Sequence, residues 1–431
     1  MKTHETEVLI VGAGPVGLLT AVILSQAGVR VEIIDREERS AARSYACALH
    51  PSTLDLLDQF GLSQLLVNRG RQIRTMAFYD GPVRQVDADF KTSDTKFPFI
   101  LVLPQSELEE ILETKLRRGG IAVHWNHRFD DLRPDEDSIV ATLEELEGTA
   151  MGYIVPHWET IVKKRFCTRA RFVVGADGHN SLVRKRLGIG YQKVAPAETF
   201  VACEFSSETT VLDELRIVLN ESTSNAFWPM PDNKLRWTFQ LIHSEPILDF
   251  PEKERRAVRF GETLANENIR RNLLRLSGLR APWFSADVNE ILWCKQVPFE
   301  RGLAQTPGMN RAWLVGDSAH QTGPIGVQSL NAGLLEANAL ARCVEQVLKD
   351  DGPMGLLASY GHGVRDQWLP LIGANGLLRP RHSGHSWLAR RANRIVPCLP
   401  AVGDRLPILA QQLGLELVRT DKVASQALEA T

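Results

Sequence analysis

The sequence has little net charge and no cysteine pattern suited to a metal. Fifty Lys and Arg residues stand against 52 Asp and Glu residues, which leaves no excess charge to attract nucleic acid non-specifically. The six cysteines form no C-x-x-C pair and no cluster with histidine, so we expect neither a zinc site nor a disulfide framework. We predict six free thiols in a cytoplasmic protein, at Cys47, Cys167, Cys203, Cys294, Cys343 and Cys398.

The sequence also lacks a targeting segment, an internal repeat and a low-complexity tract. The uncharged run at residues 8–24 follows Glu5 and Glu7 instead of basic residues, and three glycines and a proline interrupt its first half. These features argue against a signal peptide or a membrane helix. At 431 residues, with 44% hydrophobic and 24% charged residues, the chain reads as globular and too long for one compact domain.

A glycine-rich loop follows the first apolar run. Residues 8–11 read as a buried parallel strand. In the loop, which also contains Pro15, Gly12 permits a tight turn, Gly14 lets the backbone approach a pyrophosphate, and Gly17 lets the next helix pack close to the sheet. The N–H groups at that helix start would face the phosphate.

The strand after this helix supports a dinucleotide site. Gly28 ends the helix, and the second strand ends at Asp35, eighteen residues past Gly17, where a carboxylate can accept hydrogen bonds from ribose hydroxyls. Asp35 would repel the 2′-phosphate of NADP, although Arg36 would partly offset this. Arg43, on the polar loop that follows, could reach a pyrophosphate or be a solvated loop arginine.

Two later segments repeat the order of strand, small-residue turn and helix. The first ends in Asp177-Gly178 and precedes a helix that Asn180 or Ser181 could cap; such a turn also occurs for purely structural reasons. The second contains Gly316-Asp317 and a loop rich in Pro and Gly. The long helix that begins near residues 329–331 would direct its N–H groups into that loop and favour an anion.

The region between these segments has a different pattern. From about residue 191 to 299, alternating strands carry aromatic residues, which predicts a mostly antiparallel sheet with one solvated face. Phe227, Trp228 and Trp237 are candidates both for the core and for the wall of an apolar substrate pocket. The tail, residues 353–431, reads as a helical cap packed on the body, with a peripheral membrane helix as the alternative and no membrane span.

Taken together, the three motifs resemble the class A flavoprotein monooxygenases, which are built like para-hydroxybenzoate hydroxylase. That family has an N-terminal G-x-G-x-x-G, a central D-G motif and a late G-D motif that runs into a P-x-G-G-Q-G-x-N loop. The matching residues here are 12–17, 177–178, 316–317 and 324–331, and the resemblance covers about residues 5–350. A thioredoxin-like third domain has no room, so the chain resembles the shorter single-component form.

The resemblance implies FAD as the cofactor and NADPH or NADH as the reductant. Asp35 would hold the adenosine ribose, and Asp317 the ribityl hydroxyls. Asp177 would lie where FAD meets the nicotinamide, and residues 324–331 would flank the isoalloxazine ring. The cofactor-binding residues so implied are Gly12, Gly14, Pro15, Gly17, Asp35, Arg36, Arg43, Gln105, Asp177, Gly316, Asp317, Pro324, Gly326, Val327, Leu330 and Asn331.

The resemblance also implies a reaction. One oxygen atom of O2 would pass, through a flavin C4a-hydroperoxide, to a small aromatic or unsaturated substrate, by hydroxylation or epoxidation. Pro324 and the three aromatic residues named above would line the substrate pocket. The sequence shows no catalytic base, and His50, His320 and Arg236 are candidates by position only.

Three positions depart from the family pattern. Val327 and Ser329 replace loop glycines, where a Cβ atom could crowd the flavin or shift it, and Glu336 stands where an aspartate is usual. These departures keep open a flavoprotein of the same fold that reduces, dehydrogenates or isomerises without oxygen insertion. A nucleotide-binding regulatory protein without turnover is a third possibility, against which the aromatic region argues.

The expected fold class is α/β, with a Rossmann-like FAD-binding domain interleaved with a mostly antiparallel β-sheet substrate domain and followed by a C-terminal helical extension. The FAD-binding domain would comprise residues 1–72, 101–190 and 300–350. The substrate domain would comprise residues 73–100 and 191–299, and the helical region residues 351–431.

Overall fold

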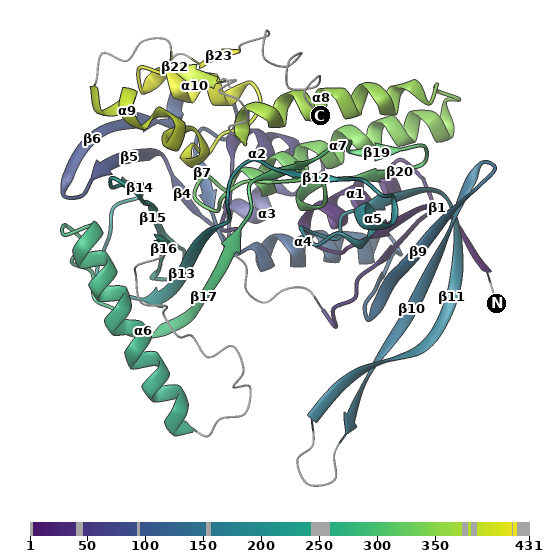
Figure 1. The fold of residues 1–431 in the computed structure, drawn as a ribbon, viewed down its shortest axis with the longest axis horizontal. Coiled ribbons are helices and arrows are strands. Elements are labelled where there is room, and N and C mark those ends of the chain that lie inside the picture. Colours follow the sequence, from purple (N-terminus) through teal and green to yellow (C-terminus); the bar gives the residue numbers. More distant parts are fainter. Residues whose placement is uncertain are drawn as a thin grey trace.

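The structure is a computed structural model. It describes residues 3–39, 46–92, 95–151, 157–242, 259–372, 378–380, 386–415 and 417–419. Figure 1 shows a parallel sheet and its helices on one side of the molecule, a second sheet on the other side, and helices of the C-terminal region over both.

Three predicted strands end side by side in the parallel sheet. β1 (Thr3–Val11) lies between β2 (Val31–Ile34) and β11 (His157–Gly175), and β11 also pairs in parallel with β20 (Ala312–Leu314). Val11 pairs with Gly175, and Gly175 pairs with Leu314. The loops after β1, β11 and β20 therefore leave the sheet at one edge, which brings the three motifs together. The strand order is β19-β20-β11-β1-β2-β8, with β8 at Val123–His124 and β19 at Gly308–Met309.

Three long helices pack on this sheet. α1 (Pro15–Gln26) contacts both α4 (Gln105–Arg118) and α7 (Gln328–Lys349). Residues 17–24 of α1 are all buried, which explains why that segment is apolar on every side. Gly28 has a φ of +73° just after the helix and ends it as predicted.

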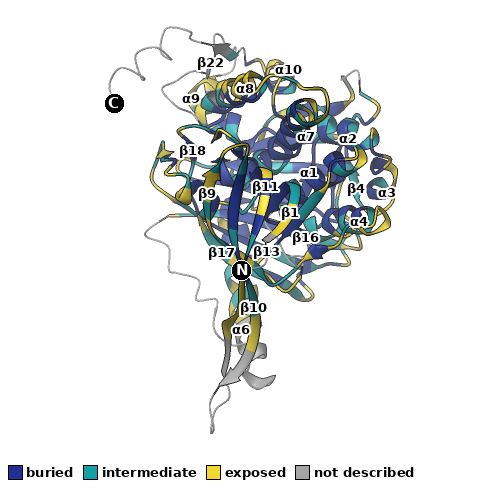
Figure 2. Cartoon of the chain, turned by 90° about the vertical axis from the view of Figure 1, so that its right-hand side faces the viewer, coloured by how far each residue is buried: buried dark blue, intermediate teal, exposed yellow. Residues whose placement is uncertain are grey.

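A long hairpin extends from the parallel sheet. β9 (His127–Asp135) pairs with β10 (Ser138–Met151), which pairs with β11, and Figures 1 and 2 show the hairpin reaching well beyond the body. The strand β10 continues to Met151 and β11 begins at His157, and residues 152–156 lie outside the described residues.

The second sheet is mostly antiparallel, as predicted, with one parallel pair between β14 and β5. Its order is β17-β13-β16-β15-β14-β5-β6. The strands are β5 (Thr75–Asp80), β6 (Val83–Asp89), β13 (Glu198–Ser206), β14 (Glu214–Leu219), β15 (Ser224–Pro229), β16 (Lys234–Leu241) and β17 (Ile291–Phe299).

The expectation of one solvated face on this sheet is wrong. α6 (Arg259–Arg280) contributes Leu273 and Leu276 to a buried cluster with Phe227 and Trp237 on one face. The opposite face joins the main core of the molecule. Both faces of the second sheet carry large aromatic side chains, Trp228 on one and Trp237 on the other. Each face is therefore buried against an apolar partner.

The expectation of six free thiols is also wrong. Cys203 on β13 and Cys294 on β17 occupy directly paired positions of neighbouring strands and form a disulfide. They are 91 residues apart in the sequence, so only the strand pairing brings them together. Cys47, Cys167, Cys343 and Cys398 are free.

The tail packs on the body through its apolar residues. Trp387 and Leu388 of α9 (Ser386–Ile395) and Leu406 and Leu409 of α10 (Arg405–Gln412) are buried in the main core. α8 (Gly355–Leu371) packs along α7. Among the described residues, no helix is long and apolar enough to cross a membrane.

Shorter elements complete the described fold. Two small sheets have the orders β12-β18-β21 and β3-β7-β4, and β22 pairs with β23. The elements are β3 (Ala48–Leu49), α2 (Pro51–Asp58), α3 (Ser63–Val67), β4 (Arg71–Ile73), β7 (Ile100–Val102), α5 (Leu182–Arg186), β12 (Tyr191–Lys193), β18 (Gly302–Ala304), β21 (His320–Gln321), β22 (Leu378–Pro380) and β23 (Leu417–Arg419).

Candidate flavin and nucleotide site

Two glycines of the first loop are required by close backbone contacts. Gly12 has a φ of +107°, and a Cβ atom there would lie 2.3 Å from the carbonyl oxygen of Ala176. A Cβ atom on Gly17 would lie 2.0 Å from the carbonyl oxygen of Gly12. These glycines therefore allow the β1 loop to touch the end of β11 and α1 to begin directly against that loop.

Gly14 has a different role, because a Cβ atom there would meet no atom within 4 Å. The space beside it is a cavity of about 230 Å³, which we term the larger cavity because it is the larger of the two that border the first loop. Its walls come from the loops after β1, β11 and β20 and from the starts of α1, α4 and α7. They include Gly14, Pro15, Gln105, Asp317, Pro324, Val327 and Leu330 of the predicted set, and Gly178 and Ser329 of the motifs. The other wall residues, which the sequence did not single out, are Val16, Ala46, Ala176, Val315, Thr322 and Gly323.

The N-termini of two helices meet at this cavity. α1 begins at Pro15 and α7 at Gln328, and residues on both sides of each helix start line the cavity. The two helices can approach closely because Gly333 of α7 has no side chain. A Cβ atom at this position would lie 3.0 Å from the Val16 side chain and 2.9 Å from the Cα atom of Gly316. Free N–H groups and positive dipole ends from two helices suit an anionic group.

A second cavity of about 200 Å³ continues along the same loop. Gly12, Asp35, Arg36 and Asp177 line it, and Ala176 borders both cavities. The Asp35 carboxylate accepts hydrogen bonds from the backbone N–H groups of Ala13 at 2.6 Å and Glu37 at 2.9 Å. Gly14, predicted to face the pyrophosphate, and Asp35, predicted to bind the ribose, thus line neighbouring cavities, and the group that each cavity binds stays a prediction.

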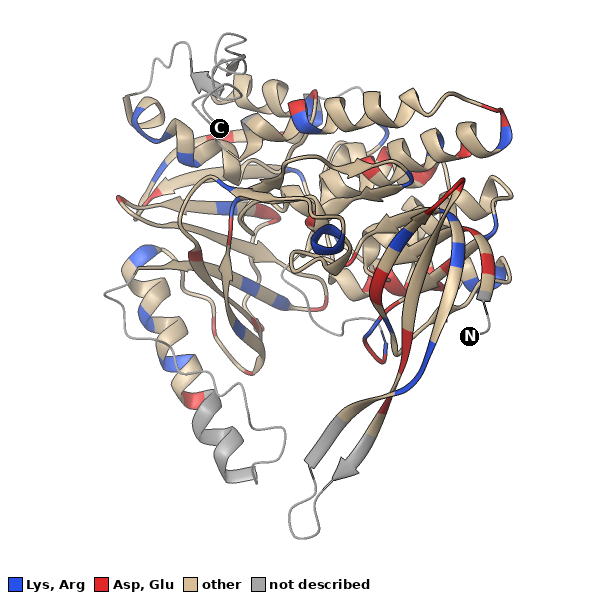
Figure 3. Cartoon of the chain, turned by 45° about the vertical axis from the view of Figure 1, so that its right-hand side comes forward, with Lys and Arg blue, Asp and Glu red and all other residues tan. Residues whose placement is uncertain are grey.

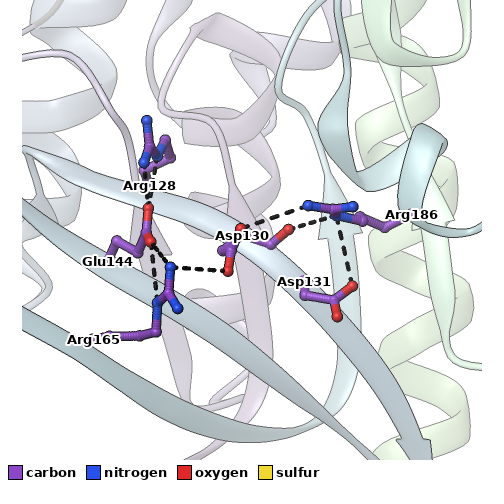
Figure 4. Close-up of polar contacts among 6 residues, drawn as sticks. All are labelled: Arg128, Asp130, Asp131, Glu144, Arg165 and Arg186. Carbon is purple, nitrogen blue, oxygen red and sulfur yellow. Dashed lines mark hydrogen bonds and ion pairs between the residues drawn. The ribbon is translucent and has the colours of Figure 1, made fainter. Parts of the chain in front are cut away.

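The wall of the second cavity includes an arginine that belongs to an ion-pair network on the hairpin strands (Figure 4). Glu144 is buried and accepts hydrogen bonds from Arg128 Nε at 2.8 Å and Arg165 Nε at 3.1 Å. Burial opposes ionisation of Glu144, but the two guanidinium groups lower its pKa below the ordinary value. Asp130, Asp131 and Arg186 extend the network, and Figure 3 shows both charge signs interspersed along these strands.

Two partly buried carboxylates, Asp177 and Asp317, follow the strands β11 and β20. Asp177 accepts hydrogen bonds from the N–H groups of Leu182 at 2.7 Å and Val183 at 3.1 Å, and Ser181 caps α5 through Arg184 N. Burial raises the pKa of Asp177 and also that of Asp317. Asp177 is thus partly a helix-capping residue, while Asp317 lines the larger cavity.

The loop that resembles the family's flavin loop, residues 324–331, is held by hydrogen bonds of its own residues. Val327 adopts the left-handed conformation that a glycine would favour, with φ 50° and ψ 33°, which costs a β-branched residue roughly 1–2 kcal/mol. Ser329 Oγ accepts a hydrogen bond from Thr322 N at 2.8 Å. Asn331 donates to the carbonyls of Val327 and Ala48. The backbone therefore follows a path suited to glycine even with these side chains.

The three residues considered as catalytic candidates are internal. None of them lines the larger cavity. His320 Nε2 lies 2.6 Å from Glu336 Oε2 and stacks on Trp368. Arg236 pairs with Glu204. His50 Nε2 lies 3.0 Å from the carbonyl oxygen of Gly326, and because a carbonyl only accepts, this nitrogen carries the proton.

His50 makes the stability of the protein sensitive to acid. Burial lowers the pKa of His50 from 6.5 to about 3, so below pH 6.5 the unfolded chain binds a proton that the folded chain does not. We expect the free energy of unfolding to decrease as the pH is lowered from about 6.5 to about 3. The loss from this group is about 1.4 kcal/mol per pH unit. Chemical denaturation between pH 7 and 4 should show a shallower slope for His50→Gln.

The matched control for this prediction is His124→Gln, because His124 is exposed. It should keep the slope of the parent protein. Equal slopes for the parent and His50→Gln would show that His50 is not held neutral by burial.

The structure separates the three aromatic pocket candidates. Trp228 points to the face of the second sheet that joins the main core, together with Phe200. A Cβ atom on Gly323, beside the larger cavity, would lie 3.8 Å from the Phe200 ring. Phe227 and Trp237 pair across the opposite face, under α6. Phe227 and Trp237 thus lie on the other face from Trp228, because alternate residues of a strand point to opposite faces. Their assignment to the pocket wall stays a prediction.

The remaining predicted residues support the cavities from behind or lie elsewhere. Gly17 and Gly316 hold α1 and α7 close to the loops, and Gly326 and Asn331 fix the flavin loop. Arg43 lies outside the described residues. The sequence missed His127, Phe129 and Asn180 in the second cavity, since His127 and Phe129 belong to a strand without a recognisable motif.

Comparisons with known proteins agree with this site. A family model described as an FAD binding domain matches residues 5–367. The chain is 30% identical to the 6-methylpretetramide 4-monooxygenase of Streptomyces rimosus, over 82% of this chain and 58% of that protein. It is 25% identical to the para-nitrophenol 4-monooxygenase of Pseudomonas sp. (strain WBC-3), over 84% of this chain and 83% of that protein.

The fold is also similar to a solved structure. The crystal structure of p-nitrophenol 4-monooxygenase PnpA from Pseudomonas putida DLL-E4 aligns with a TM-score of 0.71 and 22% identity, covering 96% of this chain and 97% of that one. The chain therefore belongs to the FAD-binding family of class A flavoprotein monooxygenases, and its cofactor is FAD. The open space at Gly14, the two helix N-termini and the partly buried Asp317 in the cavity wall fit that cofactor.

Proposed function

We propose that this protein inserts one oxygen atom of O2 into a small aromatic molecule, at the expense of NADPH or NADH. The observation that carries the proposal is the position of the larger cavity, which ends at Gly323 and Pro324 beside Phe200 of the second sheet. The names of the relatives, which include monooxygenases of aromatic compounds, support the same class of substrate.

Bound FAD supplies the redox chemistry, since it accepts a hydride from the nicotinamide and reacts with O2. The chain holds and shields it. The first N–H groups of α7 and the dipole of that helix stabilise negative charge at the larger cavity. Phe200, which lies next to Gly323, and Trp228 on the same face of the second sheet would form an apolar layer behind the cavity and help to keep water from the reacting atoms.

We assign the binding of FAD and the binding of the substrate to different parts of the chain. We propose that residues 1–72, 101–190 and 300–350 bind FAD, and that residues 73–100 and 191–299 bind the substrate. Gln105, at the start of α4, borders the larger cavity opposite the α7 N-terminus. The dependence on NAD(P)H supports a cytoplasmic location. The names of the relatives are those of monooxygenases and give no support to a function without oxygen insertion.

The test uses the purified protein, its visible spectrum and 4-nitrophenol as the first probe, followed by other substituted phenols. We expect a bound flavin that NADPH or NADH bleaches slowly alone and at least tenfold faster with an accepted phenol. With isotopically labelled O2, the product should carry one labelled atom. A flavin that bleaches but yields only hydrogen peroxide with every phenol would contradict the proposal.

A further inference from the structure

The flavin loop is bound by a segment of the tail that the motifs do not include. Gln328 Nε2 lies 3.0 Å from the carbonyl oxygens of Val396 and Leu399 and 3.4 Å from that of Ala401. The Gln328 side chain is fully buried. Because three carbonyl oxygens surround it, the amide must present its NH2 group to them. This side chain therefore joins the start of α7 to residues 396–401.

The same contact is close at the backbone. A Cβ atom on Gly326 would lie 2.6 Å from the carbonyl oxygen of Pro397 and 2.8 Å from that of Leu399. No side chain fits between the flavin loop and this part of the tail. The flavin loop and this part of the tail are therefore in direct backbone contact.

The tail segment is also attached to the second sheet. Trp387 Nε1 donates a hydrogen bond to Asp80 Oδ2 at 2.7 Å, and Arg391 pairs with the same carboxylate at 3.2 Å. Arg394 donates to the carbonyls of Asn220, at 2.5 Å, and Glu221, at 3.0 Å. Asp80 ends β5, and Asn220 follows β14, so these contacts hold two turns of that sheet.

We propose that residues 386–402, which we term the tail clamp, fix the flavin loop relative to the substrate sheet, and that Gln328 is the positioning residue of this contact. The tail clamp touches the loop at one end and the sheet at the other. Besides the apolar packing of Trp387 and Leu388 in the main core, hydrogen bonds or ion pairs join it to both. Hydrogen bonds of this kind define one relative position, because displacement leaves buried carbonyl oxygens unpaired.

The role of Gln328 rests on FAD occupying the larger cavity and does not require oxygen insertion. Its first test is Gln328→Met, which keeps the length of the side chain but removes the donor. We expect the Kd for FAD to rise about tenfold, since one hydrogen-bonded amide is lost and its acceptors stay buried. Hydrogen exchange of the FAD-loaded protein should increase in peptides 324–331 and 396–401 together and stay unchanged in the Gly12 loop.

The control is Gln64→Met, because Gln64 makes one exposed hydrogen bond with Asn68 on α3. It should leave the Kd and the exchange pattern unchanged. An unchanged Kd and unchanged exchange at 324–331 in Gln328→Met would overturn the role of Gln328.

The second test asks whether the clamp transmits position from the sheet. Asp80→Asn weakens the contacts to Trp387 and Arg391 without touching the flavin loop. We expect faster exchange at residues 386–402 and at 324–331, and a threefold or larger rise in the Kd for FAD. Asp87→Asn is the matched control, since Asp87 lies on β6 of the same hairpin and pairs with Arg84 at the surface. Exchange that rises only near Asp80 and the tail clamp would reject the coupling, even if the protein proves to be a monooxygenase.

Discussion

Gly14→Val is expected to abolish FAD binding at micromolar concentrations while leaving the FAD-free protein folded. The φ of −71° and ψ of 178° at Gly14 are accessible to valine. A Cβ atom there meets no protein atom within 4 Å, and we expect the valine side chain to enter the larger cavity. We expect the Kd for FAD to rise at least 100-fold, and the free energy of unfolding without FAD to change by less than about 1 kcal/mol. Flavin fluorescence titration and urea denaturation measure the two quantities.

Gly12→Ala is the contrasting variant on the same loop. Its Cβ atom would lie 2.3 Å from a backbone oxygen at a φ of +107°, so we expect the FAD-free protein to lose roughly 3 kcal/mol or more of folding free energy. Gly14→Val protein that binds FAD like the parent would show that the pyrophosphate does not pass this glycine.

Arg236→Met is expected to lower the free energy of unfolding by about 3–5 kcal/mol, because it leaves a carboxylate without its cation inside the protein. Arg236 is 2% exposed, and its Nη2 lies 2.5 Å from Glu204 Oε1. The guanidinium group also contacts Cys47, next to the cavity residue Ala46. Urea denaturation at pH 7 measures the loss.

The double variant Arg236→Met/Glu204→Leu should regain a large part of this stability, since a buried pair that is replaced by apolar residues leaves no unpaired charge. Arg342→Met is the surface control: Arg342 pairs with Glu345 with half of its side chain exposed, and the change should stay within about 0.5 kcal/mol. A loss below 1 kcal/mol for Arg236→Met would mean that Glu204 finds another partner or reaches water.

The glycine motifs could be interpreted from the sequence because they act locally. A β-strand, a turn that needs glycine and a helix start are adjacent in the chain, so Gly12, Gly14 and Asp35 indicate a dinucleotide site without knowledge of distant contacts. The joint order of three such motifs then indicated the family, and the shared edge of β1, β11 and β20 follows from parallel strands that end alike.

The tertiary structure decided which distant residues meet. Alternation places Phe227 and Trp228 on opposite faces, but only the packing of α6 shows which face is turned away from the cavity. Likewise, strand pairing decides that Cys203 meets Cys294. Gln328 contacts residues 68–73 positions later in the chain, and no local pattern encodes such a contact. Local backbone preferences are written in neighbouring residues, whereas side-chain partners across elements depend on how the whole chain packs.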